Sequence, residues 1–258
     1  MTPGSAKTRA ELPWLYYPRN DRVIINAHNF TPPAPNFSVN GKDPLSVWCP
    51  SKDDAGNGTT TLNDLFGSND LTLQNFALSG STSNWVADTD AGGIRALDFD
   101  GTNDIATGTY WTTLGSVSAA AFSLWVRSDG KSNFGIIGTG VSDFGAFAVY
   151  SNTPANIRFL IKDTSNLLDG AITVGAWTHI VATYNGTTAR LYINGTQTAS
   201  KSVSGAISNS GKPFYLGSYY DTTYVINGRL DDIRGFNQNL DASDVAYLYN
   251  SGAGRGRS

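Results

Sequence analysis

Two adjacent acidic side chains near the end of the chain are the first residues that could do chemistry. Asp231 and Asp232 lie in the segment 228–236, Gly-Arg-Leu-Asp-Asp-Ile-Arg-Gly-Phe, whose apolar residues indicate a β-strand. Neighbouring side chains of a strand point to opposite faces, so at most one of the two carboxylates is expected to face the core. We expect the other to face solvent or a loop.

Paired carboxylates are the groups that glycosidases use as acid and as base or nucleophile. Glu11 is the only glutamate among 21 acidic residues, and the nearest run of aspartates, Asp-Phe-Asp-Gly-Thr-Asn-Asp (98–104), contains residues typical of a turn. The sequence also lacks the Gly-x-Ser-x-Gly pattern of a serine nucleophile. We therefore expect that the protein is not an enzyme, with a glycoside hydrolase as a remote alternative.

Aromatic residues in predicted loops favour ligand binding without chemistry. The loop 217–228 separates two predicted strands, and a second predicted loop spans residues 107–113. Aromatic rings can stack on sugar rings, and neighbouring polar groups can bond to sugar hydroxyls. Alternatively, the rings cover the edge of the domain or contact a neighbouring subunit, and the sequence leaves both interpretations open. The candidate ligand-binding residues are Tyr219, Tyr220, Asp221, Tyr224, Tyr110 and Trp111.

Composition excludes several classes of function. The net charge of −3 argues against nucleic acid as the main partner, and no apolar stretch reaches the ~18 residues of a membrane span. Cys49 is the only cysteine, so no intrachain disulfide can form, and we expect it to be a buried small apolar residue. The two histidines, His28 and His179, are too few for a zinc site, and His179 is expected to be structural.

Strand patterns recur from residue 45 onward. Segments 121–128, 157–163, 212–220 and 228–236 read as strands, and 177–200 reads as three strands joined by Asn-Gly turns. One helix is predicted over 241–249, with Asp241 or Ser243 as its N-cap and Gly252 as its end. The chain is therefore predicted to be all-β, a two-sheet antiparallel sandwich with one short C-terminal helix.

The first 44 residues form a different region. They hold seven of the ten prolines, which favour extended backbone, so residues 1–44 are predicted to be an extended N-terminal arm. Trp14, Tyr16 and Tyr17 are expected to dock on a surface, either of this domain or of a partner. The arm has no apolar segment typical of a signal peptide. Residues 45–250 are predicted to form the sandwich, and residues 251–258 a Gly/Arg tail.

Four motifs in this order resemble the laminin-G-like branch of the concanavalin A-like lectin and glucanase jelly rolls. They are the segment 96–108 around Phe-Asp-Gly, Phe-Ser-Leu-Trp-Val-Arg-Ser (122–128), the Trp-x-His hairpin region (177–196) and the Gly-x-Leu-Asp-Asp strand with its helix (228–252). The resemblance covers about residues 45–250 and implies the jelly-roll fold. It implies little about function, because one fold hosts many activities.

The resemblance also implies a structural Ca²⁺ on the outer face of the sandwich. Asp231 is the candidate ligand, with Asp98 and Asp100 as companions and loop carbonyls completing the shell. The alternative is that Asp231 bonds a loop amide, while Asp98, Asp100 and Asp104 stabilise a turn through backbone hydrogen bonds.

Together these features predict a non-catalytic structural and attachment protein. Because laminin-G-like sandwiches occur on phage particles, the resemblance favours a virion-surface subunit, such as a decoration or tail-fibre protein, that docks on other subunits through its arm. The alternative is a secreted or cell-surface module that binds carbohydrate or mediates adhesion. These hypotheses place the protein on a virion or outside the cell, with protein subunits or glycans as partners.

Overall fold

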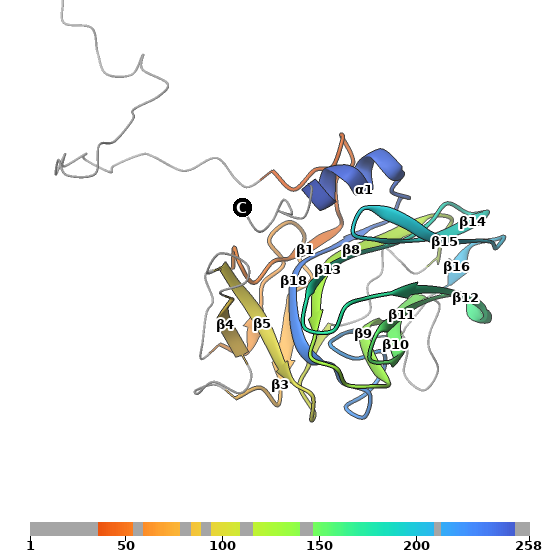
Figure 1. Ribbon diagram of the computed structural model, residues 1–258. Coiled ribbons are helices and arrows are strands. Elements are labelled where there is room, and N and C mark those ends of the chain that lie inside the picture. The colour runs from red at the N-terminus through yellow and green to blue at the C-terminus, as the bar shows by residue number, and fades with distance from the viewer. Residues whose placement is uncertain are drawn as a thin grey trace, which may run out of the picture. The chain divides into compact units, whose positions relative to one another are not determined.

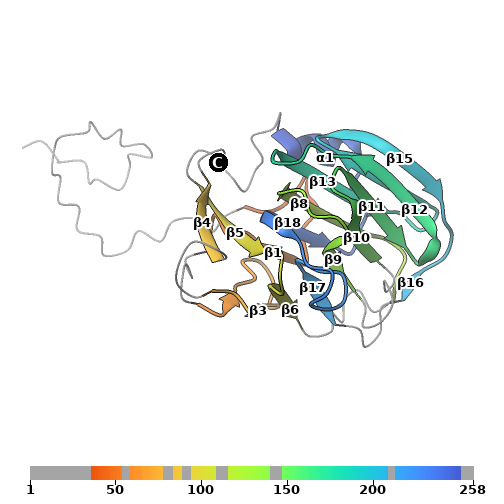
Figure 2. The ribbon, with the colours of Figure 1, turned by 60° about the horizontal axis from the view of Figure 1, so that its bottom comes forward.

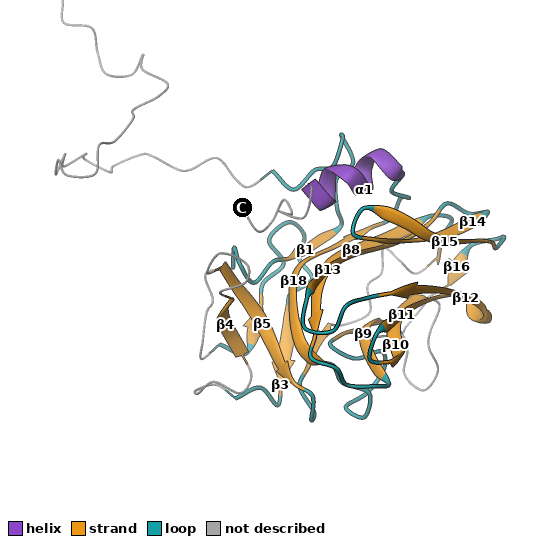
Figure 3. Cartoon of the chain, viewed as in Figure 1, coloured by secondary structure: helices purple, strands orange, loops and turns teal. Residues whose placement is uncertain are grey.

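A computed structural model of the protein describes residues 36–53, 59–77, 84–88, 94–108, 116–139, 147–208 and 213–250. Phe37–Ser258 forms one compact unit. Its described secondary structure consists of strands and one helix, joined by loops (Figure 3). No helix within these residues is long and apolar enough to cross a membrane. The predicted arm residues Trp14, Tyr16 and Tyr17 lie outside the described residues.

Two antiparallel sheets form the sandwich (Figures 1 and 2). In the first sheet the order is β15 (Thr196–Ser202), β14 (Thr188–Ile193), β13 (Trp177–Tyr184), β8 (Ala120–Ser128), β18 (Asn227–Phe236), β5 (Ile94–Asp100), β4 (Asn84–Asp88), with β1 (Ser46–Trp48) also paired to β18. In the second sheet the order is β12 (Asp163–Ala171), β11 (Asn156–Ile161), β10 (Phe147–Thr153), β9 (Phe134–Gly138), β17 (Phe214–Leu216), β6 (Ile105–Gly108), β3 (Leu71–Gln74), β2 (Thr61–Leu62). The short strands β7 (Ser116–Val117) and β16 (Ile207–Ser208) pair separately.

The predicted meander forms as expected. Strands β13, β14 and β15 are consecutive antiparallel neighbours, and positive φ angles at Gly186, Asn194 and Gly195 allow the two tight turns. The alternating apolar residues of both sheets meet in one buried core. Aromatic rings fill its centre, where Phe122 lies 5.0 Å from Phe147 between ring centroids. The two-sheet sandwich predicted from the sequence is therefore confirmed.

The helix α1 (Ala242–Tyr249) covers part of the outer face of the first sheet (Figure 1). Asp241 is its N-cap and accepts hydrogen bonds from the backbone of Ser243 and Asp244, while Asn250 ends it with φ of 46°. The sandwich begins earlier than predicted, because Phe37 and Val39 are buried against it. Val39 packs in the same apolar cluster as α1.

Asp231 and Asp232 lie where strand β18 changes partner. β5 pairs with β18 up to Leu230, and β1 pairs with it from Ile233 onward. The register on β8 shifts between Asp231 and Arg234, and Asp232 has φ of 47°, so the two aspartates occupy a β-bulge. Both side chains are buried, at 1% and 2% exposure. Neither side chain faces solvent, whereas Asp231 accepts the Ser51 amide at 3.1 Å and so faces a loop, as one of the two expectations held.

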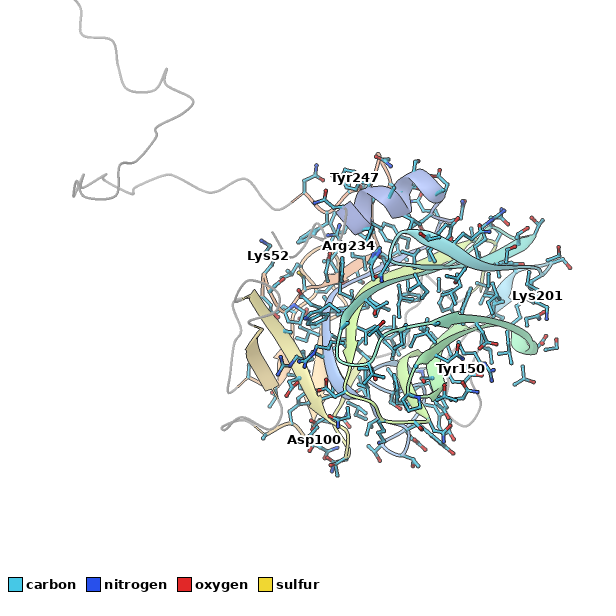
Figure 4. All side chains as sticks on the ribbon, in the orientation of Figure 1. Lys52, Asp100, Tyr150, Lys201, Arg234 and Tyr247 are labelled. Carbon is cyan, nitrogen blue, oxygen red and sulfur yellow. The ribbon has the colours of Figure 1, made fainter. Side chains whose placement is uncertain are left out.

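A buried ion pair accompanies the bulge. The Arg234 Nε and Nη2 atoms donate to the two carboxylate oxygens of Asp232 at 2.7 and 3.0 Å, and Nη1 donates to the Phe37 carbonyl at 3.2 Å. The bulge turns Arg234 and Phe236 to the outer face, although regular alternation after Leu230 would have turned them inward. Figure 4 shows Arg234 below α1, inside the covered part of this face.

His179 lies beneath α1 on the same outer face. Its Nε2 lies 2.9 Å from the Ser123 hydroxyl, and its ring packs against Trp125 and Tyr249 at centroid distances of 5.1 and 5.9 Å. Burial lowers the pKa of His179 from 6.5 to about 3, although the charge of Asp232 opposes the shift. The imidazole is therefore neutral in the folded protein, as a packing residue should be.

We expect Asp232→Asn to destabilise the protein by about 3–5 kcal/mol, because it leaves the buried guanidinium of Arg234 without its counter-charge. The matched control is Asp129→Asn, since Asp129 and Arg127 form a more exposed pair at 3.7 Å. That substitution should cost under about 1 kcal/mol. Urea unfolding followed by circular dichroism measures both values. Equal small losses in the two variants would contradict the structural role of the pair.

We also expect His179 to make stability fall as pH is lowered. Its unfolded pKa is near 6.5 and its folded pKa is about 3, so the unfolded chain binds the extra proton in this window. Unfolding free energy should therefore decrease by about 1.4 kcal/mol per pH unit between roughly pH 6 and pH 4. Urea titrations at several pH values should show a shallower decrease in His179→Gln. Parallel curves for the two proteins would rule this out.

Candidate functional site

The loop 217–226, between β17 and β18, lies directly on the outer face of β9. A Cβ atom at Gly135 would sit 2.1 Å from the Tyr219 nitrogen, and one at Gly138 would sit 1.8 Å from the Tyr219 carbonyl oxygen. Only glycine leaves room for this backbone approach. The Gly135 amide donates to the Tyr224 carbonyl at 2.7 Å, and the Gly217 amide donates to the Ile136 carbonyl at 2.8 Å. The loop is therefore fixed to the sheet by its own backbone.

Four tyrosine rings gather where this loop meets the sheet. Tyr219 lies at their centre, with ring centroids 4.8 Å from Tyr220, 4.9 Å from Tyr224 and 5.5 Å from Tyr150 of β10. Tyr219 and Tyr150 are buried, whereas Tyr220 and Tyr224 are half-buried. Burial raises the pKa of Tyr220, as does its hydrogen bond with Tyr224, so the Tyr220 hydroxyl stays protonated near neutral pH. The two outer rings thus rest on a rigid aromatic base.

A polar ladder continues from the tyrosines across the sheet. Tyr150, Arg158 and Asp169 lie directly opposite one another on β10, β11 and β12. The Arg158 Nε and Nη2 atoms donate to the two Asp169 oxygens at 2.8 and 3.3 Å, and Asn156 donates to the same carboxylate at 2.9 Å. The hydrogen bond from Arg158 lowers the pKa of Asp169. Figure 4 shows Tyr150 on this sheet.

These side chains share one outer face of the second sheet, which we call the tyrosine face. It is opposite to the face that packs in the core, because the alternate residues of β10 and β11, such as Val149 and Phe159, belong to the core cluster. Its members combine half-exposed rings with a charged pair and fixed hydrogen-bonding groups. They are Tyr150, Arg158, Asp169, Tyr219, Tyr220 and Tyr224.

The structure brings together the loop residues that the sequence singled out. Tyr219, Tyr220 and Tyr224 form one cluster, and Asp221 lies among them. One Asp221 oxygen accepts the Thr223 amide at 2.8 Å, so this side chain helps to hold the loop. The other two candidates, Tyr110 and Trp111, lie outside the described residues.

Sequence reasoning missed the part of the site that comes from β10, β11 and β12. Residues Tyr150, Arg158 and Asp169 are far apart in the sequence and meet only through strand register. Alternation in 147–153 and 156–161 could have assigned Tyr150 and Arg158 to an outer face. It could not have shown that the two residues face each other.

The three predicted calcium ligands are engaged in other contacts. One Asp231 oxygen accepts the Ser51 amide at 3.1 Å, Asp98 pairs with Arg229 at 2.9 Å, and Asp100 accepts the Thr102 amide at 2.7 Å. Across the residues that the structure describes, no three His, Cys, Asp or Glu side chains are grouped to hold a metal ion. These contacts match the alternative of loop and turn stabilisation for Asp231 and Asp100, and calcium binding stays a prediction.

Cys49 lies beside Asp231 and is buried. Burial raises the pKa of its thiol well above the usual value, and the charge of Asp231 adds to the shift. A buried neutral thiol is a poor nucleophile. This agrees with the expectation that Cys49 packs as a small apolar residue.

Solved structures of other proteins share this fold. Domain 4 of AbnA, a GH43 extracellular arabinanase from Geobacillus stearothermophilus solved in complex with arabinotriose, is 19% identical, with a TM-score of 0.57 over 80% of this chain and 98% of that one. The binding domain of botulinum neurotoxin serotype G is 15% identical, with a TM-score of 0.54 over 80% of this chain and 50% of that one. Trypanosoma rangeli sialidase with the inhibitor DANA is 15% identical, with a TM-score of 0.56 over 80% of this chain and 32% of that one. At these identities the likeness concerns the fold.

A search of curated proteins found no match. The sequence model of one family matches residues 99–246, which is more than half of the chain and contains both the tyrosine loop and the polar ladder. The description of that family names both lectins and glucanases. Membership alone therefore does not show whether a protein binds sugars or cleaves them. The chain belongs to the concanavalin A-like lectin/glucanases superfamily.

Proposed function

We propose that the protein is a carbohydrate-binding module and that its ligand lies on the tyrosine face. The observation that carries this proposal is the pair of half-exposed rings, Tyr220 and Tyr224, fixed on the buried ring of Tyr219 beside the Arg158–Asp169 pair. Aromatic faces bind the apolar side of a sugar ring, and charged or amide groups beside them fix its hydroxyls.

The fixed position of the Tyr220 and Tyr224 rings favours ligand binding over the alternative that these rings only cover the sheet. Tyr219 is buried against β9 and covers it, so Tyr220 and Tyr224 are not needed to shield that strand from water. Their orientation is nevertheless fixed by mutual contacts at 5.5 Å and by the loop backbone. A site that is ordered before binding loses less conformational entropy when the ligand arrives.

The electrostatics of the tyrosine face favour a binding site without catalysis. A glycosidase needs one carboxylic acid whose pKa is raised, so that it can protonate the leaving group. The pKa of Asp169 is instead lowered by Arg158. The proposal therefore includes no bond-breaking step.

The predicted attachment role on a virion is compatible with glycan binding and stays a prediction. Its support came from the family resemblance and from the arm residues Trp14, Tyr16 and Tyr17, which lie outside the described residues. A sugar-binding sandwich would serve a virion surface and a cell surface equally well. Because domain 4 of AbnA shares the fold and was solved in complex with arabinotriose, that sugar is a reasonable first probe.

The test is a glycan-binding measurement on the double variant Tyr220→Ala/Tyr224→Ala. We expect affinity for the glycans that bind the wild-type protein to fall about tenfold or more, because each lost ring contact is worth about 0.5–1.5 kcal/mol. A glycan array that includes arabinotriose selects the ligand, and isothermal titration calorimetry measures its affinity.

The matched control is Phe66→Ala, which removes a ring that is 43% exposed in a different loop. This variant should bind like the wild-type protein. Circular dichroism checks that all three proteins are folded. Unchanged binding by the double tyrosine variant, or no glycan bound by the wild-type protein, would contradict the proposal.

A further inference from the structure

We infer that the tyrosine face takes a neutral glycan and that the Arg158–Asp169 pair holds two neighbouring hydroxyls of that glycan. This inference rests on the proposed function and adds the class of ligand. It depends on four properties of the polar ladder: its position, its charge, its hydrogen-bonding capacity and its fixed geometry.

The ladder extends the aromatic cluster in one direction. Tyr219 lies over Gly135 of β9, which pairs with Tyr150, and the row continues through Arg158 to Asp169. Neighbouring strands are about 4.8 Å apart, so the row crosses roughly 14 Å from the tyrosine loop to β12. A ligand that stacks on Tyr220 or Tyr224 and also reaches Asp169 must be an oligosaccharide.

The charges of this face disfavour an acidic ligand. Arg158 is already neutralised by Asp169, which accepts two of its N–H groups. Asp221 adds a second negative charge close enough to Tyr219 to raise the pKa of that hydroxyl further. The carboxylate of an acidic sugar would therefore meet two negative groups and one compensated positive group. A neutral sugar meets no such repulsion.

The hydrogen-bonding groups of the pair suit a pair of hydroxyls. A guanidinium has five N–H donors and a carboxylate about four acceptor positions, so the two contacts between them leave both groups with further capacity. The side chain of Asp169 is 50% exposed and that of Arg158 is 24% exposed. One hydroxyl can donate to Asp169 while its neighbour accepts from Arg158. Neighbouring hydroxyls on a sugar ring present these two roles side by side.

The pair is also held in place before any ligand binds. Asn156 donates to Asp169 at 2.9 Å, and Tyr150 hydrogen-bonds Arg158 from the other side. All four residues lie in paired strands rather than in loops. Such support keeps the geometry of a binding pair within the tolerance that directional hydrogen bonds require.

The experiment compares Asp169→Asn with Asp163→Asn, which makes the same charge change on the same strand. Asp163 is exposed and accepts hydrogen bonds from Ser165 and Asn166 of its own strand. Calorimetry would use two neutral trisaccharides, arabinotriose and cellotriose, any neutral glycan found on the array, and one acidic trisaccharide, trigalacturonic acid.

We expect the wild-type protein to prefer the neutral sugars. Asp169→Asn should bind the preferred neutral sugar at least tenfold more weakly, because a hydrogen bond to a charged group is lost. It should also gain affinity for trigalacturonic acid, because Arg158 is then uncompensated. Asp163→Asn should match the wild-type protein for every sugar.

Some outcomes overturn this inference while leaving the proposed function intact. They are preference of the wild-type protein for the acidic sugar, or unchanged neutral-sugar binding in Asp169→Asn while Tyr220→Ala/Tyr224→Ala has lost it. No binding of any sugar by the wild-type protein contradicts both. If Asp169→Asn loses all binding and also its folded circular dichroism spectrum, the test is made with Arg158→Lys instead. That variant keeps the charge but loses the planar two-point contact, and the inference fails if its neutral-sugar affinity equals that of the wild-type protein.

Discussion

The first sheet depends on the buried contact between Asp232 and Arg234. β18 is the central strand that pairs with β8 on one side and, in succession, with β5 and β1 on the other. Where β18 changes partner, its backbone hydrogen bonds on that side are interrupted. The two carboxylates of the bulge lie there and accept hydrogen bonds from Arg234 and from the Ser51 amide. A buried arginine is costly without a charged partner. Arg234 also donates to the Phe37 carbonyl and is opposite Val47 of β1, so the pair links both segments to β18.

The tyrosine face depends on a different constraint, which is the lack of side chains at Gly135 and Gly138. These positions let the loop 217–226 lie on β9 as if it were part of the sheet. Phe99 fits against Gly217, where a Cβ atom would come within 2.1 Å of its ring. The loop is thus held from the core side and from the outer side. The loop between β17 and β18 is therefore a rigid support for the aromatic rings.

Sequence patterns predicted the turns and the helix start, which depend on the conformational preferences of neighbouring residues. Asn194-Gly195 predicted a turn because both residues tolerate positive φ, and Asp241 predicted a helix start because it can cap the first turn. The bulge at Asp232 was not predictable, because simple alternation gave Arg234 the wrong face. Similarly, the tyrosines of the loop could be found in sequence, whereas the pairing of Arg158 with Asp169 needed the register of two strands.

The covered face of the first sheet is also the side on which the described chain enters and leaves the domain. Phe37 contacts Arg234 there, and α1 with Asn250 lies over the same face, where Lys42 bonds Asp244. The described chain therefore enters and leaves the sandwich on one side, whereas the tyrosine face belongs to the other sheet (Figure 1). An attachment through either described end would therefore lie on the sheet opposite to the proposed sugar-binding face.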